Sequence, residues 1–272
     1  MSGTGIGATA EITAADARTV RGAGPGLLLA HGAGGSVEAN YGPVLDTLAA
    51  GHTVVGVDYP GTGGTPRAGT PLRLDDLADQ LVAAADAEGL DRFAVSGYSL
   101  GSTVAVRVAA RHPERVTALL LTAGFAHPGP QLRLAAETWR TLAAAGDHDA
   151  LARFLVPYAL SEAALHALTE ERLAPVVAGT AATVPPGAGD HADLVTRADV
   201  RADLARITAP TLVTVTTQDR LVPPAAQREL AAAIPGARVA ELPTGHLPFA
   251  ELPGAWGALM VEFLGEVEPR RP

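Results

Sequence analysis

The sequence predicts an α/β fold built on a doubly wound, mostly parallel sheet, and three observations lead to this fold class. Short apolar runs alternate with longer helical stretches near both ends of the chain. These runs are nearly continuous and are bounded by Gly, Pro, Asp or Ser, which is typical of strands buried on both faces. Residues 126–206, by contrast, contain no convincing strand. We therefore expect a sheet domain formed by residues 1–125 and 207–272, with residues 126–206 as an all-helical insertion.

Four apolar runs in the first half of the chain are followed by stretches whose apolar residues recur at helical spacing. Leu74, Leu77 and Leu81, for example, fall on one face of a helix. Repeated strand–helix units of this kind build a parallel sheet. The expected strands are residues 27–30, 53–57, 93–95 and 116–121, and the expected helices are residues 41–50, 74–88 and 99–111.

Residues 126–206 predict several short amphipathic helices that are broken by prolines. Ser161 is placed to cap one of them, which carries Leu165 and Leu168. Residues 179–190 combine Gly and Pro at a density that favours a flexible connection. The expected breaks lie at Pro128, Pro130, Pro157, Pro175, Pro185 and Pro186, and the aromatic candidates for a pocket wall or for the core are Phe125, Trp139, Phe154 and Tyr158.

The alternation of strands and helices resumes after residue 206. Two further strands are expected at residues 211–216 and 238–242. Helices are expected at residues 224–234, where prolines mark the start, and at residues 255–264.

Composition narrows the classes of function. The 272 residues are 47% hydrophobic and 18% charged, which is typical of a globular protein rather than a disordered one. Twenty basic and twenty-nine acidic residues give a net charge of −9, so we expect no nucleic-acid partner. All the basic residues are Arg and Cys is absent, which excludes lysine Schiff bases, thiolate nucleophiles and thiolate metal sites. We expect neither a metal nor a cofactor.

The sequence shows no targeting or membrane-spanning segment. Residues 1–20 have no basic residue before Arg18 and no apolar run of the kind found in signal peptides. No apolar run approaches the roughly eighteen residues that a spanning helix needs. We expect a soluble cytoplasmic protein that acts on a small molecule and does not engage a membrane. The oligomeric state stays open, with a homodimer as one alternative.

A serine between two glycines follows the expected strand at residues 93–95 and begins the next helix. In Gly97-Tyr98-Ser99-Leu100-Gly101, the glycines lack the Cβ atoms that would collide in a tight strand-to-helix turn. Such a turn exposes the Ser99 hydroxyl above the sheet edge, beside the unpaired N–H groups of a helix N-terminus. Ser99 could also be a plain helix cap, but the strand before it and the helix after it favour a nucleophile.

A nucleophilic serine needs an oriented base. His246 follows the expected strand at residues 238–242, where a loop can return it to the same sheet edge. Asp219 follows the strand at residues 211–216; alone it would be read as a turn or capping residue, but with Ser99 and His246 it completes a catalytic set. The chain order Ser, Asp, His fits this arrangement.

A glycine-rich loop, residues 31–36, follows the strand at residues 27–30. It can present backbone N–H groups toward Ser99, so the N–H groups of Ala33 and Leu100 are the expected oxyanion-hole donors. A phosphate-binding loop is the weaker alternative, because the spacing differs from known nucleotide-binding motifs and Lys is absent.

Taken together, these motifs resemble those of α/β-hydrolase fold serine hydrolases over about residues 27–126 and 209–264. The loops at residues 57–63 and 245–248 are also similar to loops of that family, and residues 126–206 resemble its cap domain, which roofs the active site. The resemblance implies an acyl-enzyme route with Ser99 as nucleophile, His246 as general base and Asp219 orienting the imidazole. A serine in this position argues against dehalogenases and epoxide hydrolases, which carry Asp.

The resulting hypothesis is a hydrolase of an ester, thioester or lactone of a small to medium apolar substrate. An alternative uses the same triad for elimination, cyclisation or acyl transfer on a bacterial secondary-metabolite intermediate. A ligand-binding protein without catalysis is a third reading, for which an intact triad would be unnecessary.

Overall fold

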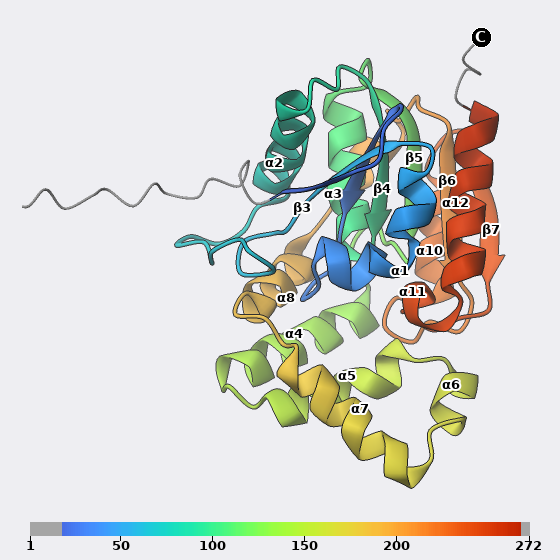
Figure 1. Ribbon diagram of the computed structural model, residues 1–272. Coiled ribbons are helices and arrows are strands. Elements are labelled where there is room, and N and C mark those ends of the chain that lie inside the picture. Colours follow the sequence, from blue (N-terminus) through green and yellow to red (C-terminus); the bar gives the residue numbers. More distant parts are fainter. Residues whose placement is uncertain (1–17, 268–272) are drawn as a thin grey trace, which may run out of the picture.

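The computed structural model describes residues 18–267, and its centre is one seven-stranded sheet (Figure 1). The strands are ordered β1-β3-β2-β4-β5-β6-β7, and only the edge strand β1 runs antiparallel to its neighbour. The doubly wound, mostly parallel sheet that the sequence predicts is therefore confirmed. The strands are β1 (Arg18–Arg21), β2 (Gly26–Ala30), β3 (Thr53–Val57), β4 (Phe93–Tyr98), β5 (Val116–Thr122), β6 (Thr211–Thr216) and β7 (Arg238–Leu242).

The central strands are mostly apolar and are buried because helices cover both faces of the sheet. Leu27 and Leu29 of β2 pack into the cluster on the side of α1 (Val37–Ala49) and α12 (Pro253–Val267). The intervening Leu28 packs into the opposite cluster, with the remaining sheet helices. Those helices are α2 (Leu74–Ala87), α3 (Leu100–Arg111) and α10 (Pro224–Ala232), and the short α11 (Pro248–Glu251) precedes α12.

Two short elements were not expected from the sequence. Strand β1 reads Arg-Thr-Val-Arg and is half-buried or exposed, so it lacks the apolar run that marks the central strands. Helix α11 has four residues, too few to show a helical period. The sequence predicts no signal peptide in residues 1–20, and most of this segment lies outside the described residues. Residues 268–272 also lie outside them.

The chain between β5 and β6 is helical, and Figure 1 shows α4 to α8 gathered together below the sheet. No strand occurs in this stretch, all of which the structure describes. In the described part of the chain, no helix combines the length and apolar character that crossing a bilayer requires. The helices are α4 (Pro130–Ala144), α5 (His148–Ala159), α6 (Glu162–His166), α7 (Glu170–Ala182), α8 (Ala188–Arg197) and α9 (Arg201–Leu204), and we call them the inserted helices.

The helix breaks expected at Pro157 and Pro175 are wrong, because these residues lie inside α5 and α7. Pro157 falls in the last turn of α5, only two residues before the helix ends at Ala159. The flexible connection expected at residues 179–190 is also wrong over most of its length. Only residues 183–187 lie outside the two helices, and Gly187 N–H donates to the Gly61 carbonyl at 2.9 Å. The Ser161 cap is confirmed by a 3.1 Å bond from Ala164 N–H.

Candidate active site

The strand-to-helix turn at Ser99 has the strained geometry that the glycine pattern predicts. Ser99 has φ 53° and ψ −120°, in a region that residues with a Cβ avoid at a cost of about 1–3 kcal/mol. A Cβ on Gly97 would lie 2.3 Å from the Gly101 carbonyl oxygen, and one on Gly101 would lie 1.9 Å from that of Ala30. Ser99 occupies the cap position of α3, but its side chain makes no capping bond, so its hydroxyl is free for another partner.

The structure brings Ser99, His246 and Asp219 together in one hydrogen-bonded chain. Ser99 Oγ lies 2.9 Å from His246 Nε2, and His246 Nδ1 lies 2.7 Å from Asp219 Oδ2. All three residues are buried. Because a carboxylate only accepts, Nδ1 carries the proton, and Nε2 can therefore accept the proton of the Ser99 hydroxyl.

The Asp219 carboxylate is fixed by more than the imidazole. Its Oδ1 accepts the N–H groups of Leu221 and Val222, both at 2.9 Å, and its Oδ2 also accepts the Thr216 hydroxyl at 2.9 Å. Gln227, fully buried on α10, donates to the Thr216 hydroxyl oxygen at 2.8 Å. The turn-forming and the imidazole-orienting readings of Asp219 thus hold together. Thr216 and Gln227 were missed, because no local pattern links a strand end to a helix eleven residues later.

The loop that carries His246 is held from both sides. The inserted helices contribute the Ala159 carbonyl, which accepts His246 N–H at 2.7 Å. Tyr98, beside the nucleophile, donates its hydroxyl to the His246 carbonyl at 2.9 Å, and its ring lies 5.3 Å from the imidazole. Glu251 Oε1 accepts Gly245 N–H at 3.1 Å. The imidazole therefore has little freedom to rotate away from Ser99.

The glycine-rich loop, residues 31–36, is ordered by hydrogen bonds to three of its amides. The N–H groups of Gly32, Gly34 and Gly35 donate to Asn40 Oδ1, His191 Nδ1 and the Gly32 carbonyl, respectively. Within the described residues, the Ala33 N–H has no such partner. Leu100 is the first residue of α3, so its N–H also lacks a helical acceptor. Within the described residues, the N–H groups of both Ala33 and Leu100 therefore lack a protein acceptor, and Ala33 lines the same cavity as Ser99.

The peptide that carries the Ala33 N–H is oriented through its own carbonyl. The Gly32 carbonyl accepts His31 Nδ1–H at 2.8 Å and Gly35 N–H at 3.2 Å. The described chain has no cis peptide bond, so the Ala33 N–H points away from that carbonyl. His31 Nε2 accepts Tyr59 N–H at 2.8 Å, and burial lowers the His31 pKa to about 3, which keeps the ring neutral.

A cavity of about 370 Å³ opens beside Ser99 and His246. The inserted helices and the loop after α7 supply one wall, and Trp139 stands among its residues. Among the residues that the structure describes, no Asp, Glu or Arg lines this cavity. Of the other aromatic candidates, Phe125 lines a small adjoining space with Ser99, whereas Phe154 and Tyr158 pack against the core. The cavity therefore suits an uncharged group.

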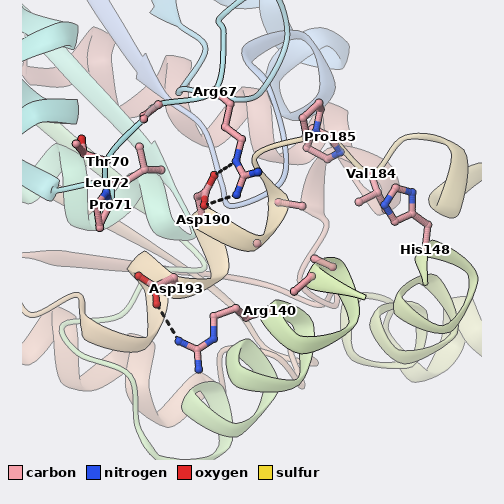
Figure 2. Close-up of a pocket in the computed structure, with 17 residues that line it drawn as sticks. Arg67, Thr70, Pro71, Leu72, Arg140, His148, Val184, Pro185, Asp190 and Asp193 are labelled. Atoms are coloured by element: carbon pink, nitrogen blue, oxygen red, sulfur yellow. Dashed lines mark hydrogen bonds and ion pairs between the residues drawn. The ribbon is translucent and has the colours of Figure 1, made fainter. Parts of the chain in front are cut away.

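A second, larger cavity of about 740 Å³ lies between the loop before α2 and the inserted helices α4 and α8 (Figure 2). Arg67 and Arg140 face it, each paired with an acid of α8, Asp190 at 2.5 Å and Asp193 at 2.9 Å. Neither Ser99 nor His246 lines it. The cavity at Ser99 is therefore the one that belongs to the triad. Among the described residues, no group of three or more acids and histidines is arranged to hold a metal.

Comparisons with known proteins place the chain in a family and match its fold. The family described as alpha/beta hydrolase fold matches residues 25–253. A protein of Xenorhabdus hominickii named pyrrolizixenacetamide deacetylase is 32% identical over 247 residues, which cover 90% of this chain and 92% of that protein. The enol-lactonase from Burkholderia xenovorans LB400 superposes with a TM-score of 0.80 at 26% identity, over 91% of this chain and 95% of its own. A hydrolase from Pseudomonas aeruginosa PA01 gives 0.78 at 29%, over 91% and 93%.

Proposed function

The chain belongs to the alpha/beta hydrolase fold family and is a hydrolase, and on this premise we propose that it cleaves esters, thioesters or lactones through an acyl-enzyme. The observation that carries the proposal is the hydrogen-bonded chain from Ser99 through His246 to Asp219. His246 removes the Ser99 proton as Oγ attacks the substrate carbonyl, and Asp219 stabilises the imidazolium that forms. His246 then protonates the leaving group and activates the water that releases the acyl group.

The Ala33 and Leu100 N–H groups form the oxyanion hole in this proposal. Both flank Ser99 and both are amides without another acceptor, as described above. The tetrahedral intermediate carries a full negative charge on oxygen, which the substrate carbonyl does not. Each donor thus lowers the barrier by about 3 kcal/mol through an interaction stronger in the transition state.

The inserted helices, residues 126–206, serve as the cap over this site. Trp139, Leu155 and Thr183 from this segment line the cavity at Ser99, opposite the triad. A volume of about 370 Å³ fits a small to medium acyl group, and the lack of charged side chains in its wall favours a neutral one. Similarity to an enol-lactonase supports lactones among the substrates, and similarity to a deacetylase extends the range to be tested to acetamides.

A fluorophosphonate probe tests the nucleophile directly. We expect the wild-type protein to be labelled on Ser99 and Ser99→Ala to remain unlabelled. Ser102→Ala is a matched control, because Ser102 is buried in the same helix and bonds only backbone carbonyls. Equal labelling of wild type and Ser99→Ala would reject Ser99 as the nucleophile.

Incorporation of solvent oxygen into the product distinguishes hydrolysis from elimination, cyclisation and acyl transfer. Turnover of an ester panel in heavy-oxygen water must place one solvent oxygen in the acid product. An intact triad that releases product without solvent oxygen would instead support elimination, cyclisation or acyl transfer.

A further inference from the structure

His191 is a buried histidine of α8 that the proposed chemistry does not use. It has no exposed surface, and each ring nitrogen bonds the backbone of a different segment. Nδ1 accepts the Gly34 N–H at 3.1 Å, and Nε2 lies 3.0 Å from the Pro60 carbonyl oxygen. Because a carbonyl only accepts, the proton is on Nε2 and Nδ1 is left as an acceptor. One side chain of the inserted helices thus joins the loop after β2 to the loop after β3.

Both bonds require a neutral imidazole. A protonated ring would face the Gly34 N–H with a second donor and would lose that bond. The rings nearest to His191 are His31 and Tyr59, at 6.2 Å and 5.9 Å, and the neighbouring Asp190 is already paired with Arg67. Burial lowers the His191 pKa, in agreement with a ring that stays neutral.

Several contacts fix the start of helix α8, so His191 can in turn position the loop at residues 31–36. Gly187 N–H donates to the Gly61 carbonyl at 2.9 Å, and a Cβ on Gly61 would lie 2.5 Å from Gly187 Cα. On the outer side, Arg67 and Asp190 form a two-pronged ion pair, visible in Figure 2. The start of α8 is therefore anchored to residues 60–67 at three points, of which His191 is the innermost.

The segment that His191 contacts contains a glycine with a positive φ, which restrains the backbone little by itself. Gly34 has φ +66° and follows Ala33, whose N–H is the proposed oxyanion donor, so the peptide between them is flanked by a residue with few steric restraints. Gly32 N–H is bound by Asn40 and Gly35 N–H by the Gly32 carbonyl, whereas His191 is the only acceptor of the Gly34 N–H among the described residues. Loss of this bond therefore removes the hydrogen bond that orients the Gly34 amide.

We propose that His191 is a positioning residue that holds the oxyanion loop, residues 31–36, through the Gly34 N–H. The inference rests on the proposed function, because it assigns the Ala33 N–H to the oxyanion hole. In this proposal the inserted helices do not only cover the cavity. Their residue His191, 157 positions after Gly34 in the sequence, also helps to form the oxyanion hole. His191 acts on the reaction only through the backbone and does not touch the reacting atoms.

Two substitutions of His191 test its two hydrogen bonds, to the Gly34 N–H and to the Pro60 carbonyl, one at a time. His191→Asn can keep an acceptor near the place of Nδ1, and His191→Gln can keep a donor near the place of Nε2. We expect His191→Gln to lower kcat by about tenfold to a hundredfold with KM changed by less than about threefold, since a donor is displaced rather than deleted. His191→Asn should retain kcat within about threefold. Asp193→Asn is the matched control on α8, with kcat unchanged, because its partners Arg140 and Arg197 lie outside residues 60–67.

A transition-state analogue distinguishes positioning from packing. Binding of an alkyl trifluoromethyl ketone, which forms a tetrahedral adduct with Ser99, should weaken across the variants in parallel with kcat/KM, while the affinity for the unreactive alcohol analogue stays constant. Equal loss of kcat in the Asn and Gln variants, or loss of activity without loss of ketone affinity, overturns the proposal.

The proposal can still be tested if His191→Gln does not fold or if Ser99 is not the nucleophile. If His191→Gln does not fold, a loss of more than about tenfold in kcat for folded His191→Asn rejects the assignment, and retention supports it. Failure of the proposed function shows separately, because Ser99→Ala would then still turn over the substrate used for the series.

Discussion

The Asp219 carboxylate is oriented so that its two oxygens have different tasks. Oδ1 serves the Leu221 and Val222 N–H groups, and Oδ2 serves His246. In Asp219→Asn the amide oxygen must stay on the side of the two backbone donors, so the amide nitrogen faces His246 Nδ1 and donates to it. The proton is then forced onto Nε2, which can no longer accept from Ser99.

We expect Asp219→Asn to lower kcat by on the order of 10³- to 10⁴-fold with little change in KM. Steady-state kinetics on a chromogenic ester measures the effect. Asp193→Asn, at a partly exposed position of α8, controls for the loss of one negative charge and should leave kcat unchanged. A reduction of less than about tenfold for Asp219→Asn would remove this residue from the triad.

His31 makes the stability of the fold depend on pH. Its pKa is lowered from 6.5 to about 3, chiefly by burial, so between these values the unfolded chain binds a proton that the folded chain does not. Stability is therefore highest above pH 6.5 and falls as the pH drops toward 3, by up to on the order of 5 kcal/mol from this group. Urea unfolding of wild type and His31→Asn across this range tests the point. The variant should start less stable and show a flatter pH dependence; parallel curves would contradict it.

At the residue scale, the sequence predicted the side chains that meet at the site but not those that hold them. Ser99, Asp219 and His246 each follow a strand, and parallel strands bring such positions to one edge. Gln227 and His191 reach the site through hydrogen bonds between distant segments, and no period or motif in the chain marks such contacts.

At the scale of elements, the junction between α7 and α8 shows why glycine and proline density misled the expectation of flexibility. The connection, residues 183–187, is only five residues long. Gly187 allows the backbone to pack closely against residues 60–61, and it does not serve to make the connection flexible. A Cβ there would lie 2.6 Å from the Pro60 carbonyl oxygen. Backbone against backbone leaves no flexible side chain to yield, so α8 itself would have to move.

Gly187→Ala should therefore lower the free energy of unfolding by about 1–3 kcal/mol and reduce kcat as α8 shifts. Gly189→Ala is the matched control two residues on, where the nearest atom outside the helix backbone is 3.6 Å away and ordinary contact results. Urea unfolding and steady-state kinetics measure both effects. If the two variants are equally stable and active, the anchoring of α8 at residues 60–61 has no energetic weight.

At the scale of the whole molecule, the fold was predictable because its core strands are nearly continuous apolar runs, as is typical of strands buried on both faces. What the sequence could not supply is the closeness of the inserted helices to the sheet edge. The Ala159 carbonyl and His191 come from α5 and α8, yet they bond the loops that carry His246 and the expected oxyanion donor. Such contacts arise from packing between segments, and hydrophobic periodicity reports only which face of each helix is buried.

The net charge of the chain and the uncharged lining of the cavity at Ser99 both predict a preference for a neutral acyl group. The chain carries a net charge of −9, and among the described residues no Arg lines the cavity at Ser99 to pair with an anion. We expect kcat/KM for 4-nitrophenyl butyrate to exceed that for the 4-nitrophenyl half-ester of succinate by at least about tenfold, beyond the ratio of their spontaneous hydrolysis rates. Added salt should recover only part of the difference, because it screens the distant net charge and not the desolvation of a buried carboxylate.

A variant with a basic residue in the cavity wall identifies the cause of this preference. Leu155 lines the cavity from α5, so Leu155→Arg should raise the relative rate on the succinate half-ester. Leu134→Arg adds the same charge on α4 at a side chain that is 64% exposed, and it should leave the ratio unchanged. Equal changes in both variants would assign the preference to net charge alone, and equal rates on both esters in the wild type would place the acyl group outside this cavity.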